Sequence, residues 1–485
     1  MRLNEIIKGI GCEVVGSVDV DVADVQFDSR KVGQGSLFVA QRGTKTDGHN
    51  YIGKAVSQGA VAVICETMPA NVEDGVAYII VKDSSEALGL AAANYYGHPS
   101  ERLALVGITG TNGKTTTVTL LHRMFRSLGF HAGLLSTIVN KIDDEEIPAS
   151  HTTPDALELN ALLCRMADAG CRYVFMEVSS HAVVQRRIAG LRFAGGIFSN
   201  ITHDHLDFHG TMANYIAAKQ AFFTMLPRGA WALTNIDDRN GMVMVQNTKA
   251  EVHTYALQRV ADYHCRVIED TFEGMHLDID GSEVWCRLVG RFNAYNLTAI
   301  YAAARLCGVG KEDALLRLSA LLPAPGRFQY VAGRGITGIV DYAHTPDALQ
   351  NVLDTIAAIR RTRQQIITVV GCGGDRDRTK RPEMAKIAAE CSDKVVLTSD
   401  NPRMEKPEDI LDDMERGLTA EQLCRVVRIT DRRQAIRTAV MMAREGDIVL
   451  VAGKGHENYQ EVNGVRHHFD DVEELEGWLK ENNDK

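Results

Sequence analysis

The chain reads Gly-Ile-Thr-Gly-Thr-Asn-Gly-Lys-Thr-Thr-Thr over residues 107–117, directly after the apolar run 103–106. Glycines in such a loop let backbone N–H groups approach phosphate oxygens closely, Lys114 adds a positive charge, and Thr115 offers a hydroxyl to Mg²⁺. The apolar periodicity of residues 118–128 predicts a helix whose positive end points at the nucleotide. The stretch therefore predicts a strand, a phosphate loop and a helix that together bind ATP with magnesium.

One position of this loop departs from the usual spacing. The pattern Gly-x-x-x-x-Gly-Lys-Thr needs glycine at position 108, where Ile108 stands, and the upstream glycines are Gly107 and Gly110. A chance match in a turn is the alternative interpretation. The apolar strand before the loop and the apolar helix after it favour a phosphate loop.

The length and composition of the chain limit the classes of protein that it fits. Its 485 residues predict about two to four domains, and the net charge of −10 argues against nonspecific nucleic-acid binding. No apolar run is long enough to cross a bilayer, and the amino terminus lacks the apolar core of a signal peptide, so we expect a cytoplasmic protein without a membrane partner. The ten cysteines contain no Cys-x-x-Cys pair, which favours reduced structural thiols.

Short apolar runs alternate with helical segments along the whole chain, which indicates an α/β fold with parallel sheets. His98-Pro99 is one candidate joint between domains, and the Pro/Gly cluster at 322–326 is another. We therefore predict three domains at 1–98, 99–330 and 331–485. The middle one has helices on both faces of a parallel sheet, and the last has a second α/β sheet.

Glu177 follows the apolar run 173–176 and opens the sequence Glu-Val-Ser-Ser-His. A carboxylate at the carboxyl edge of a parallel sheet is a natural Mg²⁺ ligand beside a phosphate loop. The alternative is a surface glutamate paired with Arg172.

Three histidines and two aspartates lie within residues 200–210, again after an apolar run. Their spacing makes a zinc site the first possibility to test, but no thiolate supports it, and the nearby phosphate loop favours a second Mg²⁺ ligand. Loop histidines that simply contact the aspartates are the third interpretation.

Lys219 stands on an otherwise apolar helical segment, 215–223. The default interpretation is a lysine that extends along the surface to water. If it is buried instead, its pKa falls, and the neutral amine becomes a nucleophile that can capture CO₂ as a carbamate, which is a metal-binding anion.

Three polar loops follow apolar strands in the last third of the chain, at 371–378, 400–403 and 453–457. Asp-Asn-Pro-Arg at 400–403 combines a guanidinium that can grip a carboxylate with groups that can receive an ammonium. Each loop alone is weak evidence, because a glycine-rich turn can be purely structural. Together at one sheet edge they predict an amino-acid site.

Six motifs carry a resemblance to a known family. They are Thr-Gly-Thr-Asn-Gly-Lys-Thr at 109–115, Glu-Val-Ser-Ser-His at 177–181, Asp-His-Leu-Asp-x-His-Gly at 204–210, Tyr-x-x-Ala-Lys at 215–219, Gly-Arg-Phe-Asn-x-x-Asn at 290–296 and Asp-Tyr-Ala-His-Thr-Pro at 341–346. In this order they resemble the Mur ligase family over essentially the whole chain, and the unusual phosphate-loop spacing is the form which that family uses.

The resemblance implies a UDP-sugar-binding domain, a central ATP-binding domain and a Rossmann-like amino-acid-binding domain. It also implies roles for individual residues. The ATP phosphates would be bound by Thr109, Gly110, Thr111, Asn112, Gly113, Lys114 and Thr115. Asn293 and Arg327 would lie near the nucleotide, and Asp341 would meet its ribose. The magnesium ions would be positioned by Thr115, Glu177, His205 and a carbamylated Lys219. The catalytic residues would be Lys114, Glu177, His205 and Lys219.

For the other substrates, Ser29 would touch the UDP end of the sugar nucleotide. Its muramoyl-peptide part would be held by Thr152, Thr153, Ser179, Gln185 and Arg187. The incoming amino acid would be selected by Arg376, Asp400, Asn401, Pro402, Arg403, Gly453 and Glu457. Asp-Asn-Pro-Arg is typical of members that add meso-diaminopimelate.

The resemblance thus implies an ATP-dependent amide ligase, expected to be a monomer, that joins meso-diaminopimelate to UDP-MurNAc-L-Ala-D-Glu through an acyl phosphate in peptidoglycan synthesis. A folylpolyglutamate synthetase is the nearest rival, although the long segment before the phosphate loop and the Asp-Asn-Pro-Arg motif argue against it. A P-loop small-molecule kinase would stop at phosphoryl transfer. A noncatalytic nucleotide-binding protein would not need Lys114, Glu177 and Lys219.

Overall fold

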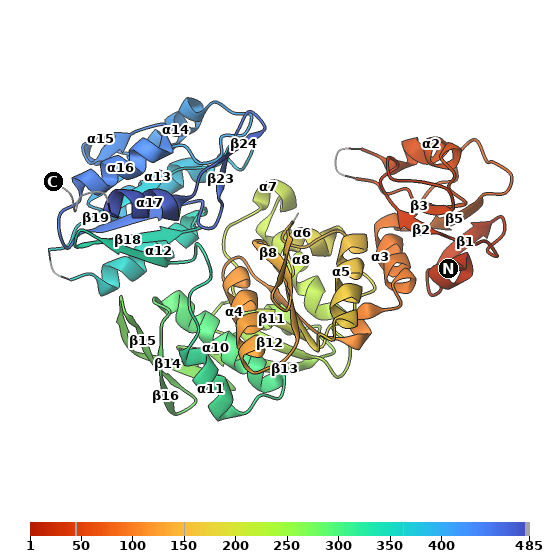
Figure 1. Cartoon of the computed structure of the whole chain (residues 1–485), viewed down its shortest axis with the longest axis horizontal. Helices are drawn as coiled ribbons and strands as arrows, with labels where there is room; N and C mark the ends of the chain where they lie inside the picture. The colour runs from red at the N-terminus through yellow and green to blue at the C-terminus, as the bar shows by residue number, and fades with distance from the viewer. Residues whose placement is uncertain (44–45, 150, 362, 481–485) are drawn as a thin grey trace.

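The computed structural model describes residues 1–43, 46–149, 151–361 and 363–480. Three main sheets follow one another along the molecule, and the two ends of the chain lie at opposite ends of the row (Figure 1). Among the described residues, no helix combines the length and the apolar character that crossing a membrane requires. All ten cysteines are free, as the sequence predicted.

The amino-terminal sheet has the order β1-β5-β4-β3-β2, with β1 antiparallel to β5 and the other pairs parallel. Its strands are β1 (Cys12–Val15), β2 (Asp24–Gln26), β3 (Ser36–Val39), β4 (Ala62–Cys65) and β5 (Ala77–Val81). Its helices are α1 (Leu3–Ile6), α2 (Ile52–Ser57) and α3 (Ser84–Tyr95), with a 3₁₀ turn at Gly48–Tyr51. The fully apolar β4 is buried along its whole length, as expected for a strand covered on both faces.

The central sheet is parallel in its middle, in the order β14-β13-β12-β11-β6-β10-β7, which confirms the predicted parallel arrangement there. It continues antiparallel at both ends, through β15 and β16 beyond β14 and through β8 and β9 beyond β7. The sequence patterns do not reveal these two extensions, because outer strands such as β9 and β16 are partly exposed and lack the long apolar runs on which the parallel prediction rested.

The strands of this sheet are β6 (Ala104–Thr109), β7 (Ala132–Leu135), β8 (Val139–Ile142), β9 (Glu145–Pro148), β10 (Tyr173–Glu177), β11 (Gly195–Phe198), β12 (Trp231–Asn235), β13 (Glu251–Ala256), β14 (Tyr263–Thr271), β15 (Gly274–Ile279) and β16 (Ser282–Cys286). Its helices are α4 (Lys114–Ser127), α5 (Ala156–Asp168), α6 (Ser180–Val184), α7 (Leu206–His209), α8 (Met212–Met225), α9 (Gly241–Val245), α10 (Arg291–Leu306) and α11 (Lys311–Ser319), after a 3₁₀ turn at Pro99–Arg102.

The carboxyl-terminal sheet has the order β17-β18-β22-β19-β20-β21, and all pairs after β17 are parallel. Its strands are β17 (Gln329–Gly333), β18 (Ile336–Asp341), β19 (Ile366–Val370), β20 (Lys394–Leu397), β21 (Val426–Arg428) and β22 (Ile448–Ala452), with a separate hairpin of β23 (Tyr459–Val462) and β24 (Val465–His468). Its helices are α12 (Pro346–Ile359), α13 (Lys380–Cys391), α14 (Pro407–Glu415), α15 (Ala420–Leu423), α16 (Arg432–Met442) and α17 (Asp471–Lys480).

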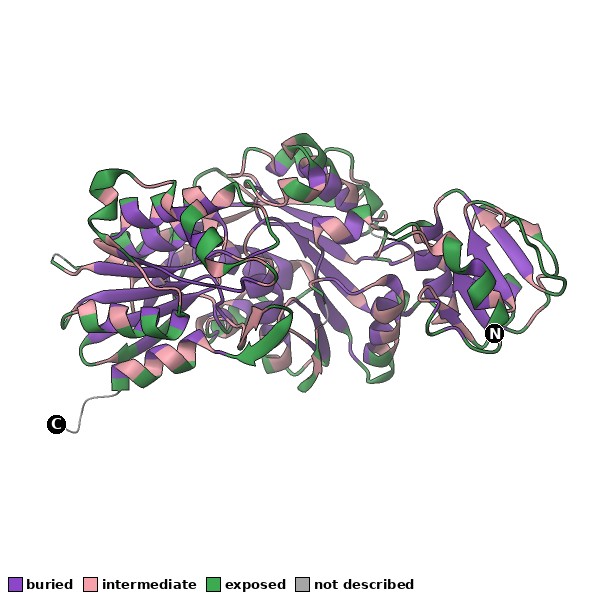
Figure 2. Cartoon of the chain, turned by 90° about the horizontal axis from the view of Figure 1, so that it is seen from above, coloured by how far each residue is buried: buried purple, intermediate pink, exposed green. Residues whose placement is uncertain are grey.

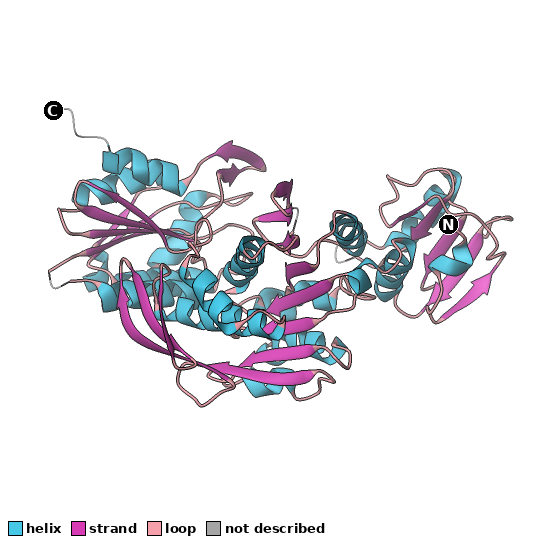
Figure 3. Ribbon diagram, turned by 60° about the horizontal axis from the view of Figure 1, so that its bottom comes forward, coloured by secondary structure: helices cyan, strands magenta, loops and turns pink. Residues whose placement is uncertain are grey.

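Helices cover both faces of the two larger sheets (Figure 3). One face of the central sheet packs against α4 and α10, and the other packs against α5 and α8. The carboxyl-terminal sheet is similarly covered by α12 and α13 on one face and by α16 and α17 on the other. The strands are therefore buried, while the helices expose their outer faces (Figure 2). Because the faces are covered, ligands can reach these sheets only at their strand ends.

Candidate active site

The phosphate loop connects β6 to α4 and is fixed by the segment after β11. The Asn112 N–H donates to Asn200 Oδ1 at 2.9 Å, and Ser199 Oγ donates to the Asn112 carbonyl at 2.7 Å. Gly113 has a left-handed backbone with φ +87°, and a Cβ there would collide with the side-chain oxygen of Asn296. The loop is thus held so closely that glycine is required at this position.

Two lysines point at one carbonyl of this loop. Lys114 Nζ donates to the carbonyls of Gly110 at 2.9 Å and Thr111 at 2.8 Å, and Lys219 Nζ donates to the Gly110 carbonyl at 2.7 Å. Lys219 is only 1% exposed and lies 4.7 Å from the centre of the Tyr215 ring, so the expectation that it extends to water is wrong. Burial and the neighbouring Lys114 charge hold the pKa of Lys219 well below its usual range.

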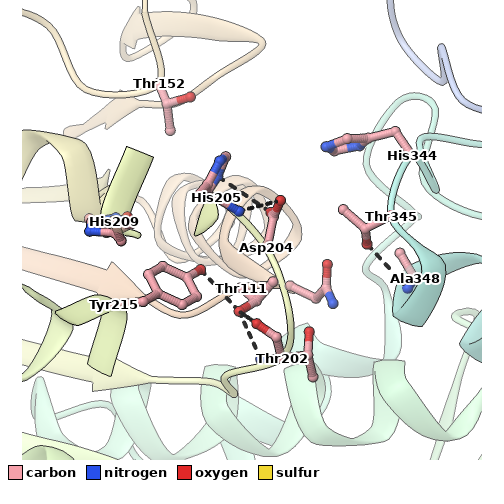
Figure 4. A network of polar contacts seen from close by, with 12 residues as sticks. Thr111, Thr152, Thr202, Asp204, His205, His209, Tyr215, His344, Thr345 and Ala348 are labelled. Carbon is pink, nitrogen blue, oxygen red and sulfur yellow. Dashed lines mark hydrogen bonds and ion pairs between the residues drawn. The ribbon is translucent and has the colours of Figure 1, made fainter. Parts of the chain in front are cut away.

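The histidine segment lies beside the loop. Thr111 Oγ1 is 3.1 Å from the Tyr215 hydroxyl and accepts from the Thr202 N–H at 3.0 Å. His205 Nε2 lies 3.4 Å from Asp204, and Figure 4 shows this pair between the Tyr215 side and His344. His344 comes from the loop after β18, so the histidine segment faces the carboxyl-terminal sheet.

Glu177 is 1% exposed and ends β10, next to β6 in the sheet. Its Oε1 accepts from the Thr137 N–H at 2.8 Å, whereas Arg172 stacks on Tyr173 with its guanidinium 5.3 Å from the ring centre. The alternative of a surface glutamate paired with Arg172 is therefore wrong.

The residues predicted to hold the muramoyl-peptide form a chain of contacts behind Glu177. Thr153 Oγ1 donates to the Glu177 carbonyl at 2.8 Å and lies 3.4 Å from Ser179 Oγ. Arg187 donates from Nη1 to the Thr153 carbonyl at 2.7 Å and from Nε to Gln185 Oε1 at 3.0 Å. Thr152 Oγ1 accepts from the Thr137 hydroxyl at 3.1 Å.

The three polar loops of the carboxyl-terminal sheet meet at one edge, as predicted, because β20, β19 and β22 are neighbours. Arg403 has a left-handed backbone with φ 52°, and its Nη1 donates to the Gly374 carbonyl at 2.6 Å. The Arg403 N–H donates to the Glu461 carbonyl at 3.0 Å, which joins the loop to the β23–β24 hairpin. At Gly453, with φ +121°, a Cβ would lie 2.5 Å from Asp400 Oδ2.

A fully buried lysine ties two of these loops together. Lys454 Nζ donates to Asn401 Oδ1 at 3.0 Å and to Glu457 Oε2 at 3.3 Å, and it lies 3.8 Å from Asp400 Oδ1. Asn401 Nδ2 donates to the same Glu457 oxygen at 2.7 Å. Burial and the charge of Asp400 raise the pKa of Glu457 above its usual range.

One cleft of about 1210 Å³ joins the phosphate loop to the amino-acid loops. The predicted residues that line it are Gly110, Thr111, Asn112, Gly113, Lys114, Thr115, Thr152, Glu177, Ser179, His205, Lys219, Arg327, Arg376, Asp400, Asn401, Arg403, Gly453 and Glu457. Those that do not line it, within the part of the chain described, are Ser29, Thr109, Thr153, Gln185, Arg187, Asn293, Asp341 and Pro402.

Models of three known domains match the chain in order. They are described as Mur ligase family catalytic domain over residues 21–96, Mur ligase middle domain over 108–304 and Mur ligase glutamate ligase domain over 326–455. A Phocaeicola vulgatus protein named UDP-N-acetylmuramoyl-L-alanyl-D-glutamate–2,6-diaminopimelate ligase is 55% identical over 477 residues, which are 98% of this chain and 99% of that protein.

The chain belongs to the Mur ligase family. A solved structure of a protein with the same printed name superposes with a TM-score of 0.70 at 34% identity, covering 99% of this chain and 98% of that one. A solved folylpolyglutamate synthase from Thermotoga maritima has a TM-score of 0.59 at 14% identity and covers 76% of this chain and 90% of its own, a likeness of fold alone. As a Mur ligase, the protein is an ATP-dependent, ADP-forming ligase.

The residues of this Mur ligase that were expected near the nucleotide come from the central and the carboxyl-terminal parts of the chain, and of Asn293, Arg327 and Asp341 only Arg327 lines the cleft. Arg327 Nη2 donates to Thr115 Oγ1 at 3.2 Å, and its guanidinium lies 4.5 Å from the centre of the Tyr342 ring. Asn293 is buried and reaches the phosphate loop indirectly, because its Oδ1 accepts from Asn296 Nδ2 at 3.0 Å. The carboxylate of Asp341 accepts from the Phe328 N–H at 2.7 Å.

The donor set of this Mur ligase fits Mg²⁺ better than zinc. Across the described residues, no group of three or more histidine, cysteine, aspartate or glutamate side chains is arranged to hold a metal ion, and this covers the histidine segment at 200–210. Glu177, the Thr115 hydroxyl and an imidazole leave room for the phosphate oxygens and waters that Mg²⁺ prefers. A carbamate on Lys219 would add an anionic oxygen, which Mg²⁺ prefers to an amine nitrogen.

Three residues of the site escaped the sequence analysis. Asn296 stands inside a quoted motif, and its packing against Gly113 was not foreseen. Lys454 stands inside a predicted loop, and nothing in the sequence distinguished a buried lysine from a solvated one. Asp347, discussed below, follows the Asp-Tyr-Ala-His-Thr-Pro motif directly.

Proposed function

We propose that the protein joins meso-diaminopimelate to UDP-N-acetylmuramoyl-L-alanyl-D-glutamate with ATP, in peptidoglycan precursor synthesis. The observation that carries this proposal is the single cleft with a phosphate loop on one wall and Asp400, Asn401 and Arg403 on the other. The names of the relatives that match nearly the full chain support the same substrates.

In the first step the D-glutamate γ-carboxylate attacks the γ-phosphorus of ATP, which gives an acyl phosphate and ADP. Two anions must approach each other, so Lys114 and the N–H groups of the phosphate loop offset their repulsion. The residues that would hold magnesium are Thr115, Glu177, His205 and carbamylated Lys219. When bound, Mg²⁺ neutralises phosphate charge and aligns the reacting oxygens.

Carbamylation is part of the proposal because Lys219 has the environment that it requires. The Lys219 nitrogen is buried, its hydrogen bond goes to a neutral carbonyl, and its pKa is lowered. The side chain therefore loses its proton more readily than that of a solvent-exposed lysine. The amine nitrogen would bond to the carbon of CO₂ and release a proton, leaving an anionic carbamate.

In the second step the amine of diaminopimelate attacks the acyl carbon, and phosphate leaves from the tetrahedral intermediate. Arg403 would pair with the far carboxylate of the amino acid, while Asp400, Asn401 and Glu457 would receive its ammonium. Lysine lacks that carboxylate and would leave the guanidinium unpaired, which accounts for selection between the two. Arg376 and Gly453 complete this wall, and the buried Pro402 shapes its turn.

The test is an amino-acid panel with ATP and UDP-MurNAc-L-Ala-D-Glu, comparing meso-diaminopimelate, L-lysine and L-ornithine. We expect mass spectrometry to detect the amide product with meso-diaminopimelate. ADP should be released only when UDP-MurNAc-L-Ala-D-Glu and the amino acid are both present. A kinase would release ADP without an amine, and a folylpolyglutamate synthetase would use a folate and glutamate instead. Amide formation with L-lysine but not with meso-diaminopimelate would overturn the substrate assignment.

Several further points belong to the same proposal. Ser29 lies in the turn between β2 and β3 of the amino-terminal domain, outside the cleft, and would meet the UDP end of an extended substrate. Joints at 98–99 and at the Pro/Gly cluster 322–326, which precedes β17, would let the three parts close around their ligands. We expect the protein to be a monomer and to be located in the cytoplasm. Sedimentation analysis would test the monomeric state.

A further inference from the structure

Asp347 connects the carboxyl-terminal sheet to the phosphate loop without lining the cleft. It stands in the first turn of α12, after Thr345, whose side chain caps the helix by accepting from the Ala348 N–H. Its Oδ2 accepts from Asn112 Nδ2 at 2.8 Å, from Thr202 Oγ1 at 3.2 Å and from Asn351 Nδ2 at 3.2 Å. Two of these three donors therefore belong to the central domain.

Both central-domain donors are themselves fixed to the nucleotide site. Asn112 is a residue of the phosphate loop, and the backbone contacts to Ser199 and Asn200 leave its side chain free to reach α12. The Thr202 N–H donates to Thr111 Oγ1 at 3.0 Å, and Thr202 starts the segment that carries Asp204 and His205 (Figure 4). One carboxylate oxygen thus joins α12 to the two segments that form the nucleotide wall.

The surroundings of Asp347 suit a carboxylate that holds two surfaces together. The amino-terminal end of α12 favours negative charge, and each donor is a neutral amide or hydroxyl. Burial is the largest influence on this group and raises the pKa of Asp347. Hydrogen bonds to a partly buried carboxylate are stronger than those between neutral groups, so the contact resists separation.

We propose that Asp347 is a positioning residue that holds the amino-acid-binding sheet against the phosphate loop, so that the acceptor amine reaches the acyl phosphate before water does. The proposal rests on the ligase function proposed above. It concerns a residue that touches neither the nucleotide nor the amino acid, since Asp347 does not line the cleft.

The chemistry supplies a direct readout of this positioning. In productive turnover the amine nitrogen bonds to the acyl carbon, the bond from that carbon to the phosphate oxygen breaks, and inorganic phosphate and a proton are released. If water attacks instead, the γ-carboxylate is regenerated, inorganic phosphate is released, and ATP has been consumed without amide formation. The ratio of ADP to amide therefore rises when the two walls are badly aligned.

The experiment measures ADP and amide together, at saturating substrates, in five proteins. These are the wild type, Asp347→Ala, Asp347→Asn, Thr202→Val and the control Asp354→Ala, which alters an exposed carboxylate farther along the same helix that contacts Gln350. We expect about one ADP per amide in the wild type and in the control. Asp347→Ala should lose amide formation by about 10- to 100-fold, with more than about two ADP per amide.

The conservative variant distinguishes positioning from a general structural role. All three donors meet a single oxygen of Asp347, so an asparagine oxygen in the same place can accept from them, and Asp347→Asn should restore a ratio near one. Thr202→Val removes one donor from the other wall and should raise the ratio in the same direction. Thermal unfolding of Asp347→Ala would reveal whether this variant folds. If it does not fold, Thr202→Val still tests the proposal.

A ratio near one in both Asp347→Ala and Thr202→Val would overturn the proposal, whatever the rate. If Asp347→Ala fails to fold, a ratio near one in Thr202→Val overturns it alone. Failure of the proposed function would look different, because the wild type itself would then form no amide with meso-diaminopimelate.

Discussion

The two walls of the cleft each contain a buried lysine, and the two lysines have opposite surroundings. Lys454 is 0% exposed and lies among Asn401, Glu457 and Asp400, so its charge has acidic partners. Lys219 is 1% exposed and contacts the neutral Gly110 carbonyl, with Lys114 as a second cation on the same oxygen. The same residue type is thus a structural cation on one wall and an amine whose protonation is disfavoured on the other.

The difference shows how the partner, rather than burial, decides what a buried lysine does. Burial alone penalises the charge of both side chains. Carboxylates on the amino-acid wall offset that penalty, whereas the second lysine on the nucleotide wall adds to it. We therefore expect substitutions at the two positions to affect different properties of the enzyme.

The largest effect is expected for turnover in Lys219→Ala. Loss of the carbamate would remove an anionic metal ligand, so amide formation should fall by about 10³-fold, which corresponds to about 4 kcal/mol of transition-state stabilisation. Steady-state assays measure this, and added acetate or formate should restore part of the rate by supplying a carboxylate. A variant as active as the wild type would remove Lys219 from the mechanism.

A smaller effect, on stability rather than rate, is expected for Lys454→Met. Glu457 and Asp400 would be left as neighbouring buried carboxylates without their cation, which should lower the free energy of unfolding by about 3 kcal/mol. The matched control is Lys219→Met, which removes a buried amine whose hydrogen bond goes to a neutral carbonyl and should be neutral or stabilising. Urea unfolding of both variants tests the comparison, and equal destabilisation would contradict it.

Arg403→Ala should change the selection of the amino acid without changing the binding of ATP. Without the guanidinium, the preference for meso-diaminopimelate over L-lysine in kcat/KM should fall by roughly 100-fold, while the KM for ATP changes little. Competition assays with both amino acids measure the preference. Equal losses with diaminopimelate and with lysine would show that Arg403 does not read the far carboxylate.

The smallest effect is expected for the pH dependence of the free energy of unfolding. The pKa of Glu457 is raised in the folded protein, chiefly by burial and then by Asp400, so the folded state binds this proton more tightly than the unfolded state does. Its contribution to stability is therefore full below the unfolded pKa of about 4.3 and is lost as pH rises through the folded pKa. Denaturant unfolding across this range should show a shallower pH dependence in Glu457→Gln, and an unchanged profile would refute this linkage.

Much of this architecture could be predicted from local sequence. The strand before the phosphate loop, the apolar runs of the carboxyl-terminal sheet and the polar residues that follow them are all short-range patterns. Parallel strands bring their carboxyl ends to one edge, so the meeting of Asp400 with Gly453 followed from strand assignment alone.

The parts that could not be predicted depend on packing between distant segments. Whether Lys219 is buried depends on the fit of α8 against the phosphate loop, which no helical pattern reveals. Asp347 resembles any acidic residue in a first helical turn until Asn112, 235 residues earlier, is placed beside it. The antiparallel strands at both ends of the central sheet have half-exposed residues whose pairing is set by their neighbours.

The central claim is that Lys219 and not Lys454 is the reactive amine. The most direct measurement is incubation of the enzyme with ¹³C-bicarbonate, followed by trapping of carbamates with a methylating reagent and peptide mass mapping. We expect label on Lys219 in the wild type, none on Lys454, and loss of activity when CO₂ is stripped from the buffer. An unlabelled Lys219 in an enzyme that keeps full activity without CO₂ would contradict this claim.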